Sequence, residues 1–166
     1  MDAVSETRLG LVAPELAARV QAMYDELAAG SPSIHIRVTQ GLRTKGEQDA
    51  LYAQGRSAPG NVVTRARGGY SAHNFGLAVD CCPDKVEGLT WSPDWDSNDE
   101  RYAAMVAAGE RQGLICGANW HSIKDEPHFQ LAGFPVTPTD AMRSDLGAGI
   151  MRELVTIWGK AGQYGG

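Results

Sequence analysis

The hydrophobic pattern changes its period near residue 30, and this change excludes an all-helical or an all-strand fold. Before that point, apolar residues recur at helical spacings of four, three and four: Leu16, Val20, Met23 and Leu27. This pattern predicts a helix over residues 14–29 that begins at a proline and ends at Gly30. The following stretch, SIHIRVT, alternates apolar and polar residues, which is typical of a half-buried strand.

The rest of the chain continues this mixture of short helices and short strands. Thr44 and Glu47 have the spacing of a helix-capping box, which predicts a helix from there to Gly55 with Leu51 facing inward. Further helices are predicted over residues 99–112 and in a C-terminal tail over 138–158 that breaks near two glycines. Short strands are predicted in three apolar runs: GLAVDCC, LICG and HFQLA. We therefore expect one α+β domain over residues 1–166, with a small, mostly antiparallel sheet flanked by helices.

Composition narrows the classes of protein to consider. The 166 residues suit one domain with a sizeable core, and 43% apolar with 21% charged residues is typical of a soluble protein. No apolar run approaches the roughly 20 residues of a membrane helix. The acidic start MDAVSETRLG shows no signal peptide, so we expect synthesis in the cytoplasm. Cys81, Cys82 and Cys116 are a poor disulfide framework and indicate a reducing compartment.

The net charge of −5 argues against a general nucleic-acid binder, which would carry a basic face. Arg56, Arg65 and Arg67 nevertheless lie close together in the Gly- and Ser-rich stretch 55–72, which reads as a long loop. Such charges usually belong to a solvated loop, but a small basic cleft is not excluded. Long ordered loops in compact domains are often functional.

Two histidines and one aspartate form an economical candidate metal site. His73 and Asp80 lie in the stretch GGYSAHNFGLAVD, and His128 lies in KDEPHFQ, where a strand begins. Zinc in hydrolases usually has three protein ligands of these types and one open position. Two neutral imidazoles and one carboxylate leave the charge of the ion partly uncompensated, so that water can be acidified towards neutral pH. Taken singly these residues also fit a turn before a strand or a lone catalytic pair.

A hydrolase of this kind also needs a base that is not a ligand, and a cation. Asp125 and Glu126 lie three and two residues before His128, and either carboxylate could serve as the base. Arg43, in GLRT, follows the predicted strand on a loop that contains glycine, where functional side chains often lie. It could hold a substrate carboxylate or a developing oxyanion.

Together these motifs resemble a known family of zinc peptidases. SAHNFGLAVD has the form S-x-H-x-x-G-x-A-x-D, and DEPHF supplies a later acid-x-x-H. This order resembles the D-alanyl-D-alanine carboxypeptidases, vancomycin-resistance dipeptidases and L-alanyl-D-glutamate endopeptidases of phage lysins. GLRTKGEQDALYAQGR and GANWHSIKDEPHF look like the endopeptidase branch. The resemblance covers about residues 34–131 and implies the D,D-peptidase/hedgehog-like fold, while the tail has no motif of this family.

The resemblance also implies a role for each matched residue. Asp125 would be the general base, Arg43 would stabilise substrate and transition state, and Ser71 would orient the site or touch substrate. Gly76 would let the chain turn so that two ligands can meet one ion. With Asp125 as the base, no catalytic role is expected for Glu126. The Zn²⁺ ligands implied by the family are His73, Asp80 and His128.

The function implied by the resemblance is a zinc-dependent peptidoglycan hydrolase that cuts the stem peptide between L-Ala and D-Glu, as an endolysin does. We expect a monomer that binds the stem peptide and does not bind nucleic acid. We also expect it to reach the wall through a holin-type membrane lesion. Two alternatives remain at this stage. One is a D-alanyl-D-alanine carboxypeptidase, and the other is a zinc-bearing binding module without catalysis.

The stretch DWDSND gives one further hypothesis. Asp94, Asp96 and Asn98 alternate as the first ligands of a calcium loop do. The glycine expected next is Asp99, however, and no glutamate stands at the twelfth position. Helix capping by Ser97 or Asn98 is the better interpretation.

Overall fold

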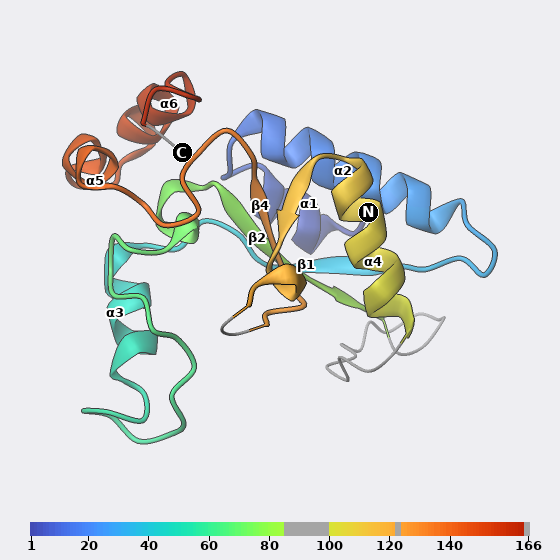
Figure 1. Ribbon diagram of the computed structural model, residues 1–166, viewed down its shortest axis with the longest axis horizontal. Coiled ribbons are helices and arrows are strands. Elements are labelled where there is room, and N and C mark those ends of the chain that lie inside the picture. The colour runs from blue at the N-terminus through green and yellow to red at the C-terminus, as the bar shows by residue number, and fades with distance from the viewer. Residues whose placement is uncertain (85–99, 122–123, 165–166) are drawn as a thin grey trace.

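A four-stranded antiparallel sheet forms the centre of the molecule (Figure 1). The computed structural model describes residues 1–84, 100–121 and 124–164. The strands follow the order β1-β2-β4-β3, and every neighbouring pair is antiparallel. Their bounds are Ile36–Gln40 for β1, Ala78–Pro83 for β2, Leu114–Cys116 for β3 and His128–Leu131 for β4. The last strand in the sequence therefore lies inside the sheet, between β2 and β3.

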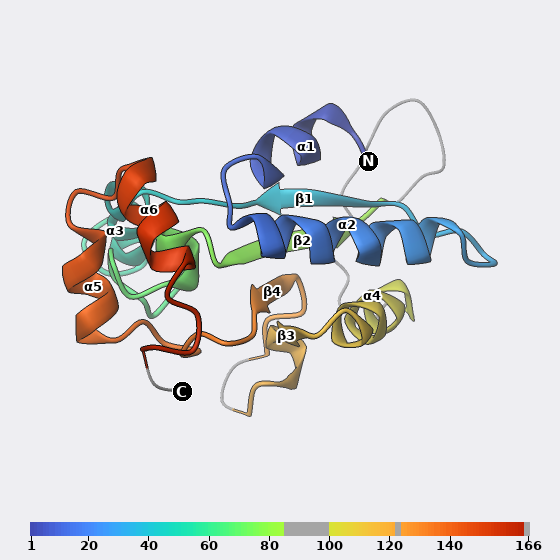
Figure 2. The same ribbon diagram turned by 90° about the horizontal axis from the view of Figure 1, so that it is seen from above.

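Six α-helices surround this sheet within the described part of the chain. They are α1 (Ala3–Leu9), α2 (Pro14–Ala28), α3 (Lys45–Ala53), α4 (Glu100–Arg111), α5 (Asp140–Leu146) and α6 (Met151–Trp158), and two 3₁₀ turns are η1 (Ala72–Phe75) and η2 (Gly117–Asn119). Helix α1 contacts β1, α2 packs on α4, and α4 contacts β3. Helices α3, α5 and α6 lie together at the end of the molecule opposite to α4 in both ribbon views (Figure 2). The expected α+β architecture is confirmed.

One continuous cluster of buried residues forms the core, and it includes residues of the sheet, of helices α1, α2 and α4, and of α5 and α6. Phe129 of β4 is fully buried, and a methyl group added at Gly109 of α4 would lie 2.5 Å from its ring. Helix and strand therefore approach as closely as a glycine allows. Burying a side chain such as Phe129 contributes about 1.5–3 kcal/mol, so this contact fixes the position of β4, the strand that begins at His128.

Most of the predicted elements are confirmed, with two differences. The capping box is present, since Glu47 N–H donates to Thr44 Oγ1 at 3.2 Å and Thr44 N–H donates to Glu47 Oε2 at 2.8 Å. In that helix, however, Leu51 is only half-buried and Gln48 is the fully buried residue. The pattern also missed α1, whose N-terminus is capped by Asp2.

None of the helices in the described residues is long and apolar enough to cross a membrane. The break predicted in the tail is confirmed, because α5 ends before Gly147 and α6 begins at Met151. The candidate calcium loop, Asp94–Asn98, lies outside the described residues.

Candidate metal centre

His73 is held by a short 3₁₀ turn whose exit requires glycine. Gly76, which ends η1, has φ +61°, a left-handed conformation that glycine adopts without strain. A methyl group at this position would also lie 3.0 Å from Trp158 Cζ2. The Trp158 indole N–H donates to Phe75 O at 2.7 Å, so the C-terminal helix α6 packs directly on the turn that carries His73.

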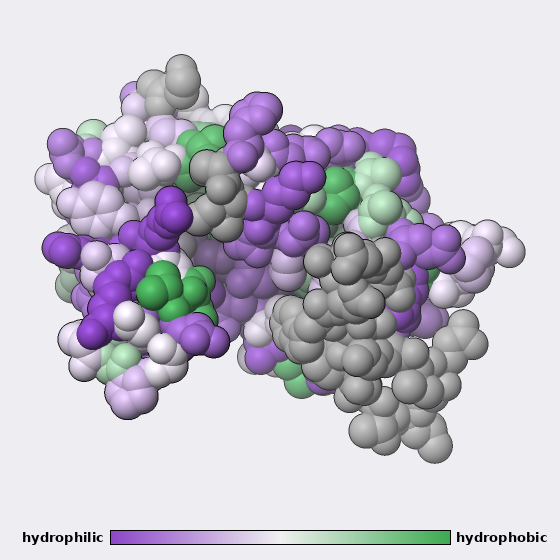
Figure 3. Space-filling model, turned by 60° about the horizontal axis from the view of Figure 1, so that its bottom comes forward, coloured by the Kyte–Doolittle hydropathy of each residue, from purple (hydrophilic) through white to green (hydrophobic). Residues whose placement is uncertain are grey.

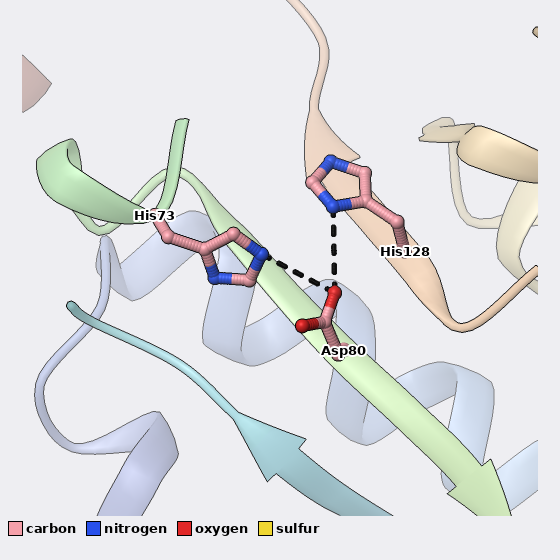
Figure 4. A group of neighbouring side chains, drawn as sticks. All are labelled: His73, Asp80 and His128. Carbon is pink, nitrogen blue, oxygen red and sulfur yellow. Dashed lines mark ion pairs between the residues drawn. The ribbon is translucent and has the colours of Figure 1, made fainter. Parts of the chain in front are cut away.

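Asp80 and His128 are supplied by the two central strands. They are directly opposed in the antiparallel pairing of β2 with β4, which brings their side chains together. Asp80 Oδ1 lies 3.2 Å from His73 Nε2 and 3.4 Å from His128 Nδ1. The two imidazole rings meet edge to face, with centroids 5.2 Å apart. Figure 4 shows both rings directed at the same carboxylate oxygen.

The hydrogen bonds behind the histidines decide which nitrogen of each ring faces Asp80 without a proton. His73 Nδ1 lies 2.8 Å from Gly41 O, and a carbonyl oxygen can only accept, so this nitrogen is the donor. His128 Nε2 lies 3.1 Å from Gln130 Oε1, which likewise makes it the donor. In the neutral rings, His73 Nε2 and His128 Nδ1 are therefore bare acceptors directed at the carboxylate.

Three acceptor atoms thus converge on one point, which is the arrangement that a cation satisfies. Asp80 Oδ1 is buried, and no group among the described residues donates a hydrogen bond to it. One ligand atom from each of His73, Asp80 and His128 lies within 4.8 Å of the others. Backbone and amide groups that fix the outer nitrogen of a ligating histidine are a common feature of metal sites. The donor set therefore fits a divalent metal that accepts nitrogen and oxygen ligands.

The charges of the protein itself also favour positive charge beside Asp80. Burial acts to raise the pKa of Asp80, but when the rings are charged, attraction to His73 and the hydrogen bonds that the protonated histidines can donate outweigh burial and hold the pKa well below its ordinary value. Burial acts to lower the pKa of His128. The hydrogen bond of its charged ring to Asp80 and the negative charge of Asp80 act in the opposite direction and are stronger, so the pKa of His128 is raised. The pocket thus favours a negative Asp80 with positive charge beside it.

Asp125 lies on the turn that leads into β4. Its backbone N–H donates to Gly117 O at 3.1 Å, and its carbonyl accepts from His128 N–H at 3.1 Å. A methyl group at Gly117 would lie 2.5 Å from Asp125 O and 3.0 Å from His128 Cβ. Burial raises the pKa of the Asp125 carboxyl, and repulsion from Asp80 raises it further. A carboxyl group with a raised pKa beside two histidines is suited to proton transfer.

Arg43 approaches the other oxygen of Asp80. Its Nη2 lies 3.6 Å from Asp80 Oδ2, and its Nη1 donates to Gln48 Oε1 at 2.7 Å. Burial lowers the pKa of this guanidinium, and the charge of Asp80 partly offsets the effect. The Arg43 backbone N–H donates to His73 O at 3.0 Å, so the arginine and the first candidate ligand are fixed to each other.

Two further residues considered in the sequence analysis, Ser71 and Glu126, lie on the segments that carry His73 and His128. Ser71 is the N-cap of η1, and its backbone N–H donates to Asn74 Oδ1 at 3.4 Å. Asn74 also donates to Arg43 O at 2.8 Å, so this side chain joins the two loops. Glu126 is half-buried. The structure brings His73, Asp80 and His128 together, while the roles assigned to Ser71, Arg43 and Asp125 stay predictions.

Sequence reasoning missed Gln48 and Trp120. Gln48 donates to Ala66 O at 2.8 Å while accepting from Arg43, so it joins the arginine to the long loop. Its signal was its position three residues before Leu51, on the same helical face. The Trp120 ring lies 4.9 Å from the His128 ring, and its indole nitrogen is buried without a hydrogen bond. No short motif marked that contact.

Three comparisons with known proteins agree with the motifs. Residues 64–131 match the model of a family described as D-alanyl-D-alanine carboxypeptidase. The peptidoglycan L-alanyl-D-glutamate endopeptidase CwlK of Bacillus subtilis (strain 168) is 39% identical over 108 residues, which are 63% of this chain and 65% of that protein. The match thus spans slightly less than two-thirds of that relative's length.

A solved structure extends the likeness to the fold. The crystal structure of the Serratia marcescens L-Ala D-Glu endopeptidase ChiX matches 80% of this chain and 89% of that chain, with a TM-score of 0.56 and 28% identity. The resemblance inferred from the motifs and the predicted fold class are both confirmed. The C-terminal helices lie outside the family match, although α6 packs on the turn that carries His73.

Proposed function

We propose that this protein is a zinc-dependent peptidoglycan hydrolase that cuts the stem peptide between L-Ala and D-Glu. The observation that carries the proposal is the convergence of two imidazole nitrogens and one carboxylate oxygen on one point, with Arg43 beside the other oxygen of that carboxylate. Burial and the charges of the same three converging side chains act on the pKa of Asp125. The two similar proteins named above are both L-alanyl-D-glutamate endopeptidases. In this proposal the protein acts on the cell wall as a monomer.

Zinc is the metal that this ligand set fits best. Two histidines with one carboxylate, with a fourth position left open, are typical of catalytic zinc in hydrolases. The ligands in this chain would be His73 Nε2, His128 Nδ1 and Asp80 Oδ1. A zinc ion held there would supply a Lewis acid to the scissile carbonyl and to water.

Asp125 and Arg43, near the proposed ligands, would carry out the other steps of catalysis. Asp125 would accept a proton from water and later donate it to the leaving amine, which its raised pKa favours. Arg43, fixed by Gln48, would hold negative charge on the substrate or on the developing oxyanion. Asp80 Oδ2 faces Arg43, so the arginine is already oriented before substrate binds.

The alternative is a D-alanyl-D-alanine carboxypeptidase, which the description of the matching family favours. Defined muropeptides incubated with the protein distinguish the two reactions by mass spectrometry of the products. The endopeptidase leaves a new amino terminus on D-Glu, and the carboxypeptidase releases free D-Ala. Activity should disappear with a chelator and return with zinc.

The Asp125→Ala variant then separates catalysis from metal binding. We expect it to retain full zinc content while its rate falls on the order of 100- to 10,000-fold. If neither product forms with the zinc-loaded wild-type protein, the proposed function is wrong and a binding module without catalysis remains. A near-normal rate in the variant would instead move the role of the base to Glu126.

A further inference from the structure

The long loop after α3 carries an excess of positive charge in an acidic protein. Residues 54–70, which we call the arm, connect α3 to η1 and project from the sheet together with that helix (Figure 1). The arm contains Arg56, Arg65 and Arg67, and no Asp or Glu occurs between residues 50 and 79, although the whole chain has a net charge of −5. The arm is therefore a locally basic stretch of an acidic chain.

Two of these arginines are held in place by an aromatic ring and by backbone carbonyls. The Arg56 guanidinium lies 4.0 Å from the Tyr52 ring centroid and donates to Tyr52 O and Thr64 O. The Arg67 guanidinium lies 5.0 Å from the same centroid. Within the described part of the chain, neither of them forms an ion pair with a carboxylate, and the same is true of Arg65. No salt bridge within the described residues neutralises their charges, although the Tyr52 hydroxyl, and to a smaller extent Asp49, lie close enough to Arg67 to raise the pKa of its guanidinium.

The backbone of the arm is fixed by groups that also reach the metal centre. Gln48, which is fully buried, donates to Ala66 O at 2.8 Å and to Thr64 Oγ1 at 3.3 Å while accepting from Arg43. Gly68 N–H donates to Asp49 Oδ1 at 2.7 Å. The arm and the arginine of the metal centre are thus joined through one amide. A ligand bound on the arm would therefore lie at a fixed position relative to the three candidate metal ligands.

Apolar side chains lie among these charges. Val62 and Val63 are 53% and 56% exposed, and Arg65, which is also exposed, follows closely in the chain. In the face drawn in Figure 3, an apolar patch lies among hydrophilic side chains beside a hollow. A surface that combines methyl groups with unpaired guanidiniums complements a ligand that combines methyl groups with carboxylates.

We propose that the arm is a wall-binding surface, which holds the carboxylates and alanine methyl groups of stem peptides adjacent to the one being cut. This inference rests on the proposed function, because stem peptides are rich in alanine and acidic groups. It gives the catalytic domain its own means of retention on the wall. Retention of this kind acts on the polymer and has no effect on a short soluble peptide that fills the cleft alone.

The test measures binding and cleavage separately. Zinc-loaded Asp125→Ala protein is sedimented with purified sacculi from which covalently attached anionic polymers have been removed. Adding Arg65→Glu should weaken binding at least tenfold at about 0.15 M salt, and higher salt should weaken the parent's binding. Arg152→Glu, which reverses one exposed charge on α6, is the matched control and should change binding less than twofold.

A second matched pair tests the apolar part of the surface. Val63→Ser should weaken sacculus binding several-fold, whereas Val155→Ser, at a valine that is 55% exposed on α6, should not. In the background with Asp125 intact, Arg65→Glu should cleave a soluble muropeptide at the wild-type rate. Equal sacculus binding by Arg65→Glu and its parent would overturn the proposal, even if muropeptides are cleaved as expected.

Other results would identify a different occupant or a different failure. Arg65-dependent binding only to sacculi that retain their anionic polymers, or only to vesicles of anionic lipid, would overturn the assignment to stem peptides. Absence of muropeptide cleavage by the wild-type protein, with Arg65-dependent sacculus binding intact, would reject the proposed reaction and support the binding surface. The two hypotheses can therefore fail independently.

Discussion

Replacing Gly117 with alanine would insert one methyl group behind the metal centre. The added carbon would lie 2.5 Å from Asp125 O, 3.0 Å from His128 Cβ and 3.1 Å from Asp125 Cβ. The shortest of these separations is about 1 Å inside an ordinary contact of roughly 3.5 Å. Neither the backbone carbonyl nor the β-carbon can rotate away, so the turn that carries Asp125 and His128 must move.

The size of this movement sets the expected effect. Overpacking of this kind costs about 1–3 kcal/mol of folding stability. A displacement of about 1 Å in a catalytic group can reduce the rate on the order of 100-fold. We therefore expect Gly117→Ala to lose 10- to 100-fold in kcat on a defined muropeptide at saturating zinc, and also to bind zinc more weakly, because His128 and Asp125 shift together.

The assay compares this variant with Gly46→Ala. A methyl group at Gly46, in the first turn of α3, meets nothing within 4 Å, and alanine there should be neutral or stabilising by about 0.5–1 kcal/mol. Rates, zinc affinity by competition with a chromophoric chelator, and melting temperature are measured for both. If Gly117→Ala kept both its rate and its zinc affinity within twofold of the wild type, the turn would not position the centre as argued.

Three further variants test other parts of the site. His128→Ala should lose zinc and activity together, and full metal content in that protein would refute its assignment as a ligand. Arg43→Lys should reduce kcat by tenfold or more with unchanged zinc content and melting temperature, because lysine lacks the planar fork; an unchanged rate would remove it from the site. Trp158→Phe, which deletes the donor to the turn of His73, should weaken zinc affinity several-fold, whereas Tyr164→Phe, which deletes a hydrogen bond within the tail, should not; equal zinc affinities would confine Trp158 to a packing role.

The sequence predicts those elements whose signals are local. The capping box at Thr44, the helical spacing before Gly30 and the glycine after η1 each act within a few residues, and the structure confirms all three. The ligand set was accessible from spacing only because several motifs occur in order along the chain. His73 and Asp80 are seven residues apart, but the register that brings His128 opposite Asp80 depends on strand pairing.

The missed features depend on contacts between distant segments. Trp158 reaches Phe75 across 83 positions of the chain, so no local pattern could assign the tail a place beside the metal centre. Gln48 looks like an ordinary polar helix residue until the arm folds over it and supplies acceptors for its amide. Trp120 is different, because it lies only eight residues before His128, yet no short motif indicates that the two rings meet.

The position of β4 has a consequence for the order of folding. Strand β3 precedes β4 in the sequence and, in the described sheet, pairs with β4 alone, so it stays unpaired until residues 128–131 are available. Those same residues include His128, which is the third proposed ligand and the pairing partner of Asp80. During synthesis, a chain that ends before His128 therefore has neither a complete sheet nor a complete ligand set. Closing the long span from Asp80 to His128 completes both in one step, and contacts of such large sequence separation form slowly. A zinc ion bound by residues of β2, β4 and η1 would stabilise this contact between distant segments, and its removal should accelerate unfolding more than it slows refolding.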